Sequence, residues 1–340
     1  MALSTIKTAS IANDAVTTDK IVNDGNLGVR NLIINGAMQV AQRGSSHTTE
    51  GYGSLDRYYL ALSGASGVTM SQQSFSTADR NSLGFEKYLK LAVTTANNNC
   101  GVYQYIEASN AVGLIGKKAT LSFYAKGTNP AGGSFTMQPA WYNTSSGGGD
   151  NAVAQSLTVT SSWVKYSFTF DIPAPANTTI DNSAYLSISF TQPAGDTSTT
   201  AWELNLAGLQ FELGEQATPF EHRSYGEELF ACQRYYSHAL TAVGVGASTT
   251  SVNAWATFPR EFRAAPTYST SGALNFSDAY STDFLQSSGA VGVISGAADG
   301  APAQFLTFGN FSSANVTQGR FMAFPRGLSN DNKIIADAEL

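Results

Sequence analysis

The chain has 340 residues, a net charge of -6 and charged side chains at only 13% of its positions, where an ordinary globular domain has about 25%. Lys and Arg form no cluster of the kind that marks a nucleic-acid partner, and no run approaches the roughly 20 apolar residues of a membrane span. Hydrophobic residues reach 42%, enough to bury a core, so we expect a folded protein. From the charge pattern and the short apolar runs we expect no nucleic-acid partner and no membrane insertion.

The first ten residues contain no apolar core of a secretory signal, so we expect synthesis in a cytoplasm. Cys100 and Cys232 are too few and too far apart for a disulfide framework or a zinc site. Both are therefore predicted to be buried, reduced thiols.

Residues 1–28 contain a short repeat, in which Ile-Ala-Asn-Asp at position 11 returns as Ile-Val-Asn-Asp at position 21. Its apolar residues follow one another at intervals of five: Ile6, Ile11, Val16 and Ile21. This interval fits neither the 3.6-residue period of a helix face nor the two-residue period of a strand face. Several parallel copies could bury one such side chain per layer, so we predict an extended oligomerising segment with these residues on its axis. The alternative is a polar tail without fixed structure.

Residues 29–224 contain many short segments rich in Val, Ile, Phe, Tyr and Thr, separated by turns rich in Gly, Asn and Ser. The predicted strands are 31–39, 57–61, 68–73, 88–94, 101–106, 119–125, 134–142, 155–160, 163–171, 185–191 and 203–213. This number of short strands predicts an antiparallel β-sandwich of jelly-roll type.

A short linker helix is predicted over residues 225–237. Ser224 or Gly226 can cap its start. The negative charges of Glu227 and Glu228 are favourable in its first turn, at the positive end of the helix dipole. The sequence of residues 238–340 again shows strand patterns, which predict a second, smaller β-sandwich. The predicted strands there are 251–258, 267–271, 290–294, 304–311, 320–325 and 333–340. The chain as a whole is therefore predicted to be all-β.

The closing strand of the first predicted sandwich carries a recognisable motif, Gly-Leu-Gln-Phe-Glu-Leu-Gly-Glu-Gln-Ala-Thr-Pro-Phe-Glu over 208–221, followed by Cys-Gln-Arg-Tyr-Tyr over 232–236. It resembles the junction in tail-fibre proteins of tailed bacteriophages, where a carbohydrate-binding-module-like jelly roll meets a distal domain. The segments 30–36 and 116–126 also resemble strands of those modules, and the N-terminal repeat is similar to repeats that begin phage fibres.

The resemblance implies a homotrimeric virion protein of the phage tail, made in the host cytoplasm. Residues 1–28 would attach it to other tail or virion proteins, and the rest would bind a host-surface glycan during adsorption. Some resembling sandwiches hold a structural calcium ion, whose ligands the sequence does not fix, and no other cofactor is expected. A purely structural head fibre, capsid decoration or baseplate adaptor without glycan binding is the alternative.

Motifs of enzyme chemistry are missing. The three histidines, His47, His222 and His238, accompany no Gly-Xaa-Ser-Xaa-Gly elbow and no metal-ligand spacing. A glycosidase needs a pair of carboxylates, but Glu212 and Glu221 are predicted on a strand edge and in a turn. We expect no enzyme, with a weak glycan hydrolase as a second alternative.

Glycan binding on a sandwich requires aromatic rings on an outer face, where they stack against sugar C–H groups. Trp141 and Tyr142 are neighbours on a predicted strand and therefore point to opposite faces, so one of them faces away from the core unless both faces are covered. We predict Trp141, Tyr142, Tyr103 and Tyr105 as glycan contacts, with core packing as the alternative for each. Trp255 is a further candidate in the last unit.

Overall fold

The computed structural model describes residues 30–340 except 65, 96–99, 132, 145–146, 193–199, 240, 272–273, 278–282, 286–290, 294–302, 310–315, 317 and 325–332. The predicted axis residues Ile6, Ile11, Val16 and Ile21 therefore lie outside the described residues. The chain divides into two compact units: one ends at His222 and lacks Val40–Arg43, and the other combines Val40–Arg43 with Arg223–Leu340.

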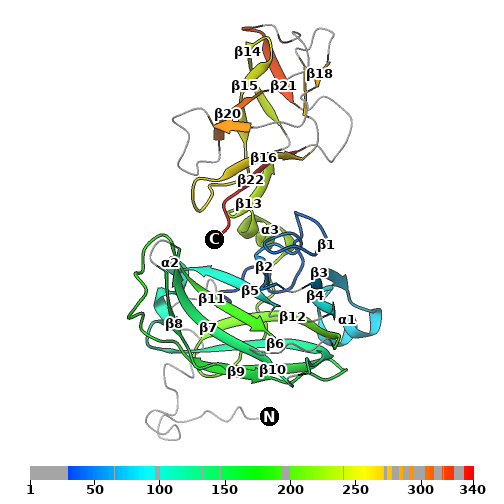
Figure 1. Cartoon of the computed structure of the whole chain (residues 1–340), viewed down its shortest axis with the longest axis vertical. Helices are drawn as coiled ribbons and strands as arrows, with labels where there is room; N and C mark the ends of the chain where they lie inside the picture. The colour runs from blue at the N-terminus through cyan, green and yellow to red at the C-terminus, as the bar shows by residue number, and fades with distance from the viewer. Residues whose placement is uncertain are drawn as a thin grey trace, which may run out of the picture. The chain divides into compact units, whose positions relative to one another are not determined.

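The first unit is an antiparallel β-sandwich of jelly-roll type, as predicted (Figure 1). Its strands are β1 (Ser46–His47), β2 (Tyr58–Leu62), β3 (Ser66–Ser74), β4 (Lys87–Thr95), β5 (Cys100–Glu107), β6 (Lys118–Thr128), β7 (Phe135–Asn143), β8 (Gly147–Asn151), β9 (Gln155–Leu157), β10 (Val164–Asp171), β11 (Ala184–Thr191) and β12 (Trp202–Leu213). One sheet has the order β1-β3-β4-β12-β6-β10, and the other has the order β2-β5-β11-β7-β8 with β9 paired to β7. Short helices α1 (Thr77–Leu83), α2 (Ala108–Ala111) and η2 (Val112–Leu114) complete the unit.

Alternation along the strands divides each sheet into an inner and an outer face. On β11, Leu186, Ile188 and Phe190 are buried in the core, so Tyr185 and Ser187 lie on the opposite face. The two inner faces meet in one continuous apolar core that also contains Trp141. The outer faces are therefore where strand residues can meet a ligand.

The predicted strand over residues 31–39 is wrong, because this segment forms an irregular turn alongside β12. The Asn31 side chain donates to the carbonyl of Leu209 at 2.9 Å and accepts from the amide of Phe211 at 3.0 Å. Asn35 and Met38 take left-handed backbone angles, with φ of 61° and 58°. The Asn31 side-chain amide thus forms hydrogen bonds with β12 that the backbone of a neighbouring strand would otherwise form.

The second unit contains α3 (Tyr225–Cys232), which starts where the helix over 225–237 was predicted but ends at Cys232, because the chain from Tyr236 already belongs to a strand. Ser224 and Glu227 form a reciprocal capping box. The strands that follow are β13 (Tyr236–Ala239), β14 (Ala242–Ser248), β15 (Ser251–Thr257), β16 (Thr267–Ser271), β17 (Asn275–Ser277), β18 (Asp283–Leu285), β19 (Val291–Val293), β20 (Ala303–Phe308), β21 (Phe321–Phe324) and β22 (Lys333–Asp337). They form two antiparallel sheets, β13-β22-β16 and β18-β17-β21-β14-β15-β20-β19.

Arg43 anchors the end of the chain within the second unit. Its guanidinium lies 3.1 Å from the Asp337 carboxylate and 3.2 Å from that of Glu339, and it stacks 3.7 Å from the ring centre of Tyr236. Only 7% of the Arg43 side chain and 6% of the Glu339 side chain are exposed. A largely buried ion pair of this kind depends on both partners being present.

Cys100 and Cys232 are both buried, as predicted. Burial raises the pKa of the Cys100 thiol to about 12, so this thiol stays protonated. Among the helices of the described ranges, none has the length and apolar character needed to cross a membrane.

Candidate functional site

The outer face of the sheet β2-β5-β11-β7 carries a cluster of tyrosines, which we call the tyrosine face. Its members are Tyr52, Tyr59, Tyr103, Tyr105, Tyr142 and Tyr185. Strand pairing sets Tyr59 opposite Tyr103 and sets Tyr185 opposite Tyr142. Tyr52 joins from the preceding loop, where Gly51 pairs with Leu60 of β2. Directly opposed residues share a face, so the fold brings these rings together.

The rings form a continuous series of contacts across the sheet. Tyr105 lies at its centre, with its ring centre 4.8 Å from that of Tyr185 and 5.6 Å from that of Tyr59. Tyr185 in turn lies 5.9 Å from Tyr142, at an angle of 26° between the ring planes. Such offset contacts hold neighbouring rings in fixed orientations, which prepares the surface for a flat ligand.

Small polar residues occupy the strand β11 between the tyrosines. Ser187 donates its hydroxyl proton to the carbonyl of Ala140, and Ser189 donates to that of Gln138. Both serines are nearly fully buried. Their hydroxyls are satisfied within the sheet, so the polar groups available to a ligand on this face are chiefly those of the tyrosines.

The hydroxyls of Tyr59, Tyr103, Tyr105 and Tyr185 stay protonated over the physiological range. Burial raises the pKa of Tyr103, Tyr105 and Tyr185 above the ordinary tyrosine value. Burial also raises the pKa of Tyr59, helped by the negative charge of Glu50, whose carboxylate accepts a hydrogen bond from that phenol at 3.2 Å. Each phenol can therefore act as both donor and acceptor toward a ligand hydroxyl.

Charge on this face is acidic. Glu107 lies opposite Tyr185, and Glu50 lies beside Tyr59. The described outward positions of β2, β5, β11 and β7 include no Lys or Arg. A neutral ligand therefore fits this face better than an anion.

Arg57 supports the strand that carries the central ring. It is buried, has a left-handed backbone with φ of 73°, and donates from its guanidinium to the carbonyl of Tyr105. A non-glycine residue with positive φ is uncommon and costs about 1 kcal/mol. The arrangement ties β5 to the loop before β2, which fixes the position of the central ring.

Three of the predicted glycan contacts meet on the tyrosine face: Tyr103, Tyr105 and Tyr142. Trp141 is a wrong prediction, because its side chain is 0% exposed and lies in the core, where its indole N–H donates to the carbonyl of Pro173 at 3.1 Å. Trp141 and Tyr142 do point to opposite faces of β7, but strand alternation alone cannot distinguish which of two neighbours faces outward.

Tyr52, Tyr59 and Tyr185 were missed by the sequence reasoning. Tyr59 and Tyr185 fall in predicted strands, but only the pairing of β2 with β5 and of β11 with β7 places them beside the other rings. Tyr52 gives no sequence signal of this kind, because it lies in a loop.

The carboxylates of the motif over 208–221 accept hydrogen bonds from neighbouring segments of the chain. Glu212 is 3% exposed and accepts hydrogen bonds from Gln210 Nε2 at 2.8 Å, Thr218 N at 2.9 Å and Thr218 Oγ1 at 2.6 Å. Glu221 accepts from the backbone amides of Arg30 and Asn31. Both carboxylates therefore accept hydrogen bonds that hold this segment in place, and Glu212 is in addition buried.

No metal-binding cluster of three or more His, Cys, Asp or Glu side chains is found in the part of the chain that the structure describes. The second unit carries a separate exposed aromatic pair. Trp255 is 51% exposed, and its ring centre lies 4.8 Å from that of Phe305 on the adjacent strand.

No protein-family model matches the chain, and no curated protein matches it. Among solved structures, the chain is similar to part of the enzymatically active domain of tailspike protein 4 of bacteriophage CBA120, at 17% identity and a TM-score of 0.36. That likeness covers 56% of this chain and 23% of the tailspike chain.

The chain is also similar to a family 11 carbohydrate-binding module of Clostridium thermocellum, at 14% identity and a TM-score of 0.30, over 52% of this chain and 98% of the module. The N-terminal cellulose-binding domain of a Cellulomonas fimi glucanase aligns at 18% identity and a TM-score of 0.30, over 52% of this chain and 100% of that domain. At these scores the likenesses do not bear on function, which rests on the site itself.

Proposed function

We propose that the protein binds a neutral glycan through the tyrosine face. The observation that carries this proposal is the unbroken series of tyrosine rings on one outer sheet face, from Tyr59 through Tyr105 and Tyr185 to Tyr142. Ring faces stack against the C–H surfaces of pyranoses, and protonated phenols exchange hydrogen bonds with sugar hydroxyls. The acidic charge of Glu50 and Glu107 disfavours an anionic sugar.

Removal of the two central rings tests this proposal. The double variant Tyr105→Ala, Tyr185→Ala should weaken binding to host envelope polysaccharide by more than about tenfold, because a central aromatic residue of a binding surface contributes about 2 kcal/mol or more. The matched control is Tyr225→Ala, since Tyr225 is 56% exposed and lies outside the tyrosine face. Equal affinity of the double variant and the wild type would reject the tyrosine face as the site.

We further propose that the chain is a tail-fibre component of a tailed-phage virion and acts in host adsorption as a homotrimer. The support is the resemblance of the motif over 208–221 and of the N-terminal repeat, together with the five-residue spacing of Ile6, Ile11, Val16 and Ile21. Residues 1–28 would attach it to other tail or virion proteins. Three linked copies would raise the apparent affinity of weak sugar contacts through effective concentration.

Two experiments separate this proposal from its alternatives. Antibody labelling of particles seen by electron microscopy should place the protein on the tail; labelling of the head, or no binding of wild type to any host glycan, would favour a head fibre, decoration or adaptor. Incubation with host polysaccharide should release no reducing ends, and their release would favour the hydrolase.

A further inference from the structure

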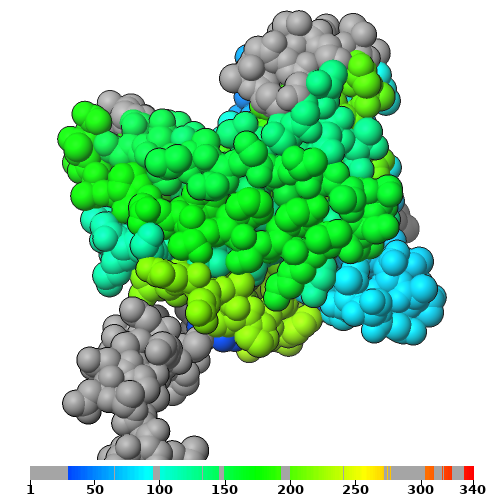
Figure 2. Space-filling model, turned by 90° about the horizontal axis from the view of Figure 1, so that it is seen from below, coloured from blue at the N-terminus to red at the C-terminus, as the bar shows by residue number. Residues whose placement is uncertain are grey.

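A hollow of about 480 Å³ lies in the first unit on the outer side of the other sheet, away from the tyrosine face. Figure 2 shows the segments around it on one face of the molecule: the α1 region in light blue, the strands β6 and β10 in green, and the segment before α3 in yellow-green. It is bounded by the end of α1, by β6 and β10, and by the chain that follows β12. We refer to it as the Phe85 pocket.

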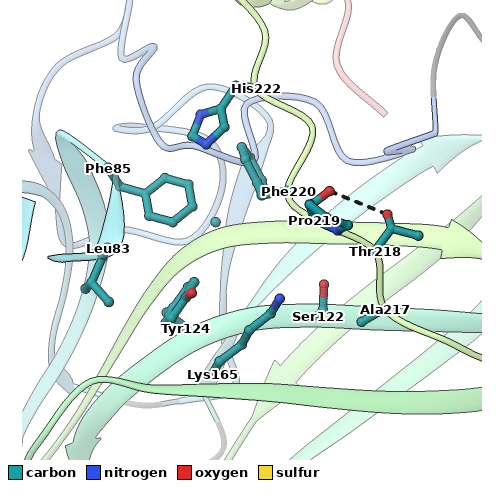
Figure 3. Close-up of a pocket in the computed structure, with 11 residues that line it drawn as sticks. Leu83, Phe85, Ser122, Tyr124, Lys165, Ala217, Thr218, Pro219, Phe220 and His222 are labelled. Atoms are coloured by element: carbon teal, nitrogen blue, oxygen red, sulfur yellow. Dashed lines mark hydrogen bonds between the residues drawn. The ribbon is translucent and has the colours of Figure 1, made fainter. Parts of the chain in front are cut away.

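Aromatic rings form one wall of the Phe85 pocket (Figure 3). The ring of Phe85 lies 5.0 Å from that of Phe220, 5.5 Å from the imidazole of His222 and 5.9 Å from that of Tyr124. Phe85 and His222 are nearly parallel, at 28°. This wall offers an apolar surface to one side of a flat or ring-shaped ligand.

A β-bulge makes room for this wall. The register between β12 and β6 shifts between Ala207 and Gln210, and Gly208 takes a φ of 60°. A Cβ atom at Gly208 would lie 2.4 Å from the Phe85 ring. The ring therefore rests directly on glycine backbone, and bulges often re-aim side chains next to binding sites.

The polar groups of the pocket suit an anion that also carries hydroxyls. Lys165 extends from β10 beside Tyr124, its partner in the strand pairing. The Lys165 side chain is exposed and belongs to none of the ion pairs among the described residues, and Ser122, which is 3% exposed, lines the same pocket. No Asp or Glu lines the pocket.

The surrounding sheet face carries further lysines, two of which form ion pairs: Lys90 with Glu203 and Lys118 with Asp171. Lys126 lies on the same side of β6 as Tyr124, and its ammonium stands 5.0 Å from the ring centre of Trp163. The tyrosine face has acidic residues and no basic one at its described strand positions, whereas the Phe85 pocket is lined by Lys165 and by no Asp or Glu. Electrostatic complementarity therefore assigns the two sites different ligands.

We infer that the Phe85 pocket binds a carboxylated sugar residue of an acidic polysaccharide, a ligand class and a site beyond the neutral-glycan function proposed above. The sugar ring packs its C–H side against Phe220, whose ring rests on that of the buried Phe85. Its carboxylate pairs with the Lys165 ammonium, and a ring hydroxyl bonds with Ser122. The inference does not depend on the tyrosine face.

Calorimetric titration with hexuronate oligomers tests this inference. The probes are oligogalacturonate, oligoglucuronate and alginate oligomers, each paired with its carboxyl-reduced form. At least one acidic probe should bind, its carboxyl-reduced form should not, and Lys165→Gln should weaken binding by about tenfold or more, the worth of a charge-assisted hydrogen bond. Lys117→Gln is the matched control, since Lys117 is exposed and lies outside the pocket.

The outcomes distinguish this site from the tyrosine face. Tyr105→Ala, Tyr185→Ala should leave acidic-probe binding unchanged, and Lys165→Gln should leave neutral-glycan binding unchanged. Absence of binding by every acidic probe, or equal affinity of Lys165→Gln and wild type, would overturn the inference. Loss of acidic-probe binding in the tyrosine variant would overturn it as well, because the site would then lie on the tyrosine face.

Discussion

Thr218 illustrates why the residues of the closing motif cannot be exchanged freely. Its amide and its hydroxyl both donate to Glu212, while the amide of Glu221 donates to Gln210 Oε1 at 2.7 Å. The buried carboxylate is thereby supplied with donors, which offsets the cost of removing it from water. The same bonds hold the segment after β12 that supplies Phe220 and His222 to the Phe85 pocket.

Thr218→Val should lower the free energy of unfolding of the first unit by about 2 kcal/mol, because it removes a hydrogen bond to a buried charged group. Urea denaturation followed by fluorescence measures the change. Thr158→Val, at an exposed threonine, should change the midpoint little. A variant of Thr218 as stable as the wild type would show that Glu212 finds other donors.

Tyr103, Tyr105 and Tyr185 should titrate late, and their ionisation should make the fold sensitive to alkali. Their folded pKa values lie above the ordinary value of 10.0, so the folded protein holds protons that the unfolded chain has lost. Their contribution to stability is present below pH 10 and is lost as the pH rises through the folded pKa values. Ultraviolet absorbance of tyrosinate follows the titration, and Tyr105→Phe should remove one late-titrating group. Ionisation of every tyrosine near its ordinary pKa would contradict this.

At the scale of elements, β12 shows both what sequence reasoning can reach and where it stops. The strand was predicted at 203–213 and observed over Trp202–Leu213. The buried positions of β12, however, switch from even to odd residue numbers at Gly208. Leu204 and Leu206 are buried before this glycine, and Leu209 and Phe211 are buried after it. A glycine between two apolar series of opposite parity indicates a bulge, and that signal was available in the sequence.

Other features could not be reached from local patterns. Helix α1 buries none of its residues, so it leaves no apolar periodicity to detect. The meeting of Tyr59, Tyr103, Tyr142 and Tyr185 depends on the order β2-β5-β11-β7, which joins strands far apart in the chain. The sequence could therefore predict which kinds of residue and which strands contribute to the candidate site. It could not predict which of these residues lie next to one another.

Gly208→Ala should disrupt the Phe85 pocket. The left-handed backbone angle costs alanine about 1–2 kcal/mol, and the added methyl group would displace the Phe85 ring. We expect lower stability and weaker binding of acidic oligomers, with neutral-glycan binding retained. Gly113→Ala is the control, because a Cβ there would meet nothing within 4 Å. Unchanged acidic-oligomer binding would show that Phe85 is not part of the site.

At the scale of the whole molecule, the first unit presents the tyrosine face on one sheet and the Phe85 pocket on the other, and the second unit adds the exposed Trp255 packed against Phe305. Single sugar sites of this kind are typically weak, so adsorption to a cell surface requires several of them at once. The proposed trimer would supply that multiplicity, since linked copies increase avidity without any new contact. The apparent affinity for a surface is thus predicted to depend on the number of linked copies.

Ile11→Ser, Val16→Ser should convert the proposed trimer to a monomer, because it removes two adjacent apolar layers of the N-terminal repeat. Multi-angle light scattering gives the mass, and Asn13→Ser serves as a control within the same segment. The monomer should bind a short soluble oligosaccharide as the wild type does, yet lose about 10²–10⁴-fold in apparent affinity for immobilised host polysaccharide. Full trimer mass in the double variant would show that the repeat does not hold the copies together. Unchanged surface affinity in a true monomer would show that one copy is sufficient for adsorption.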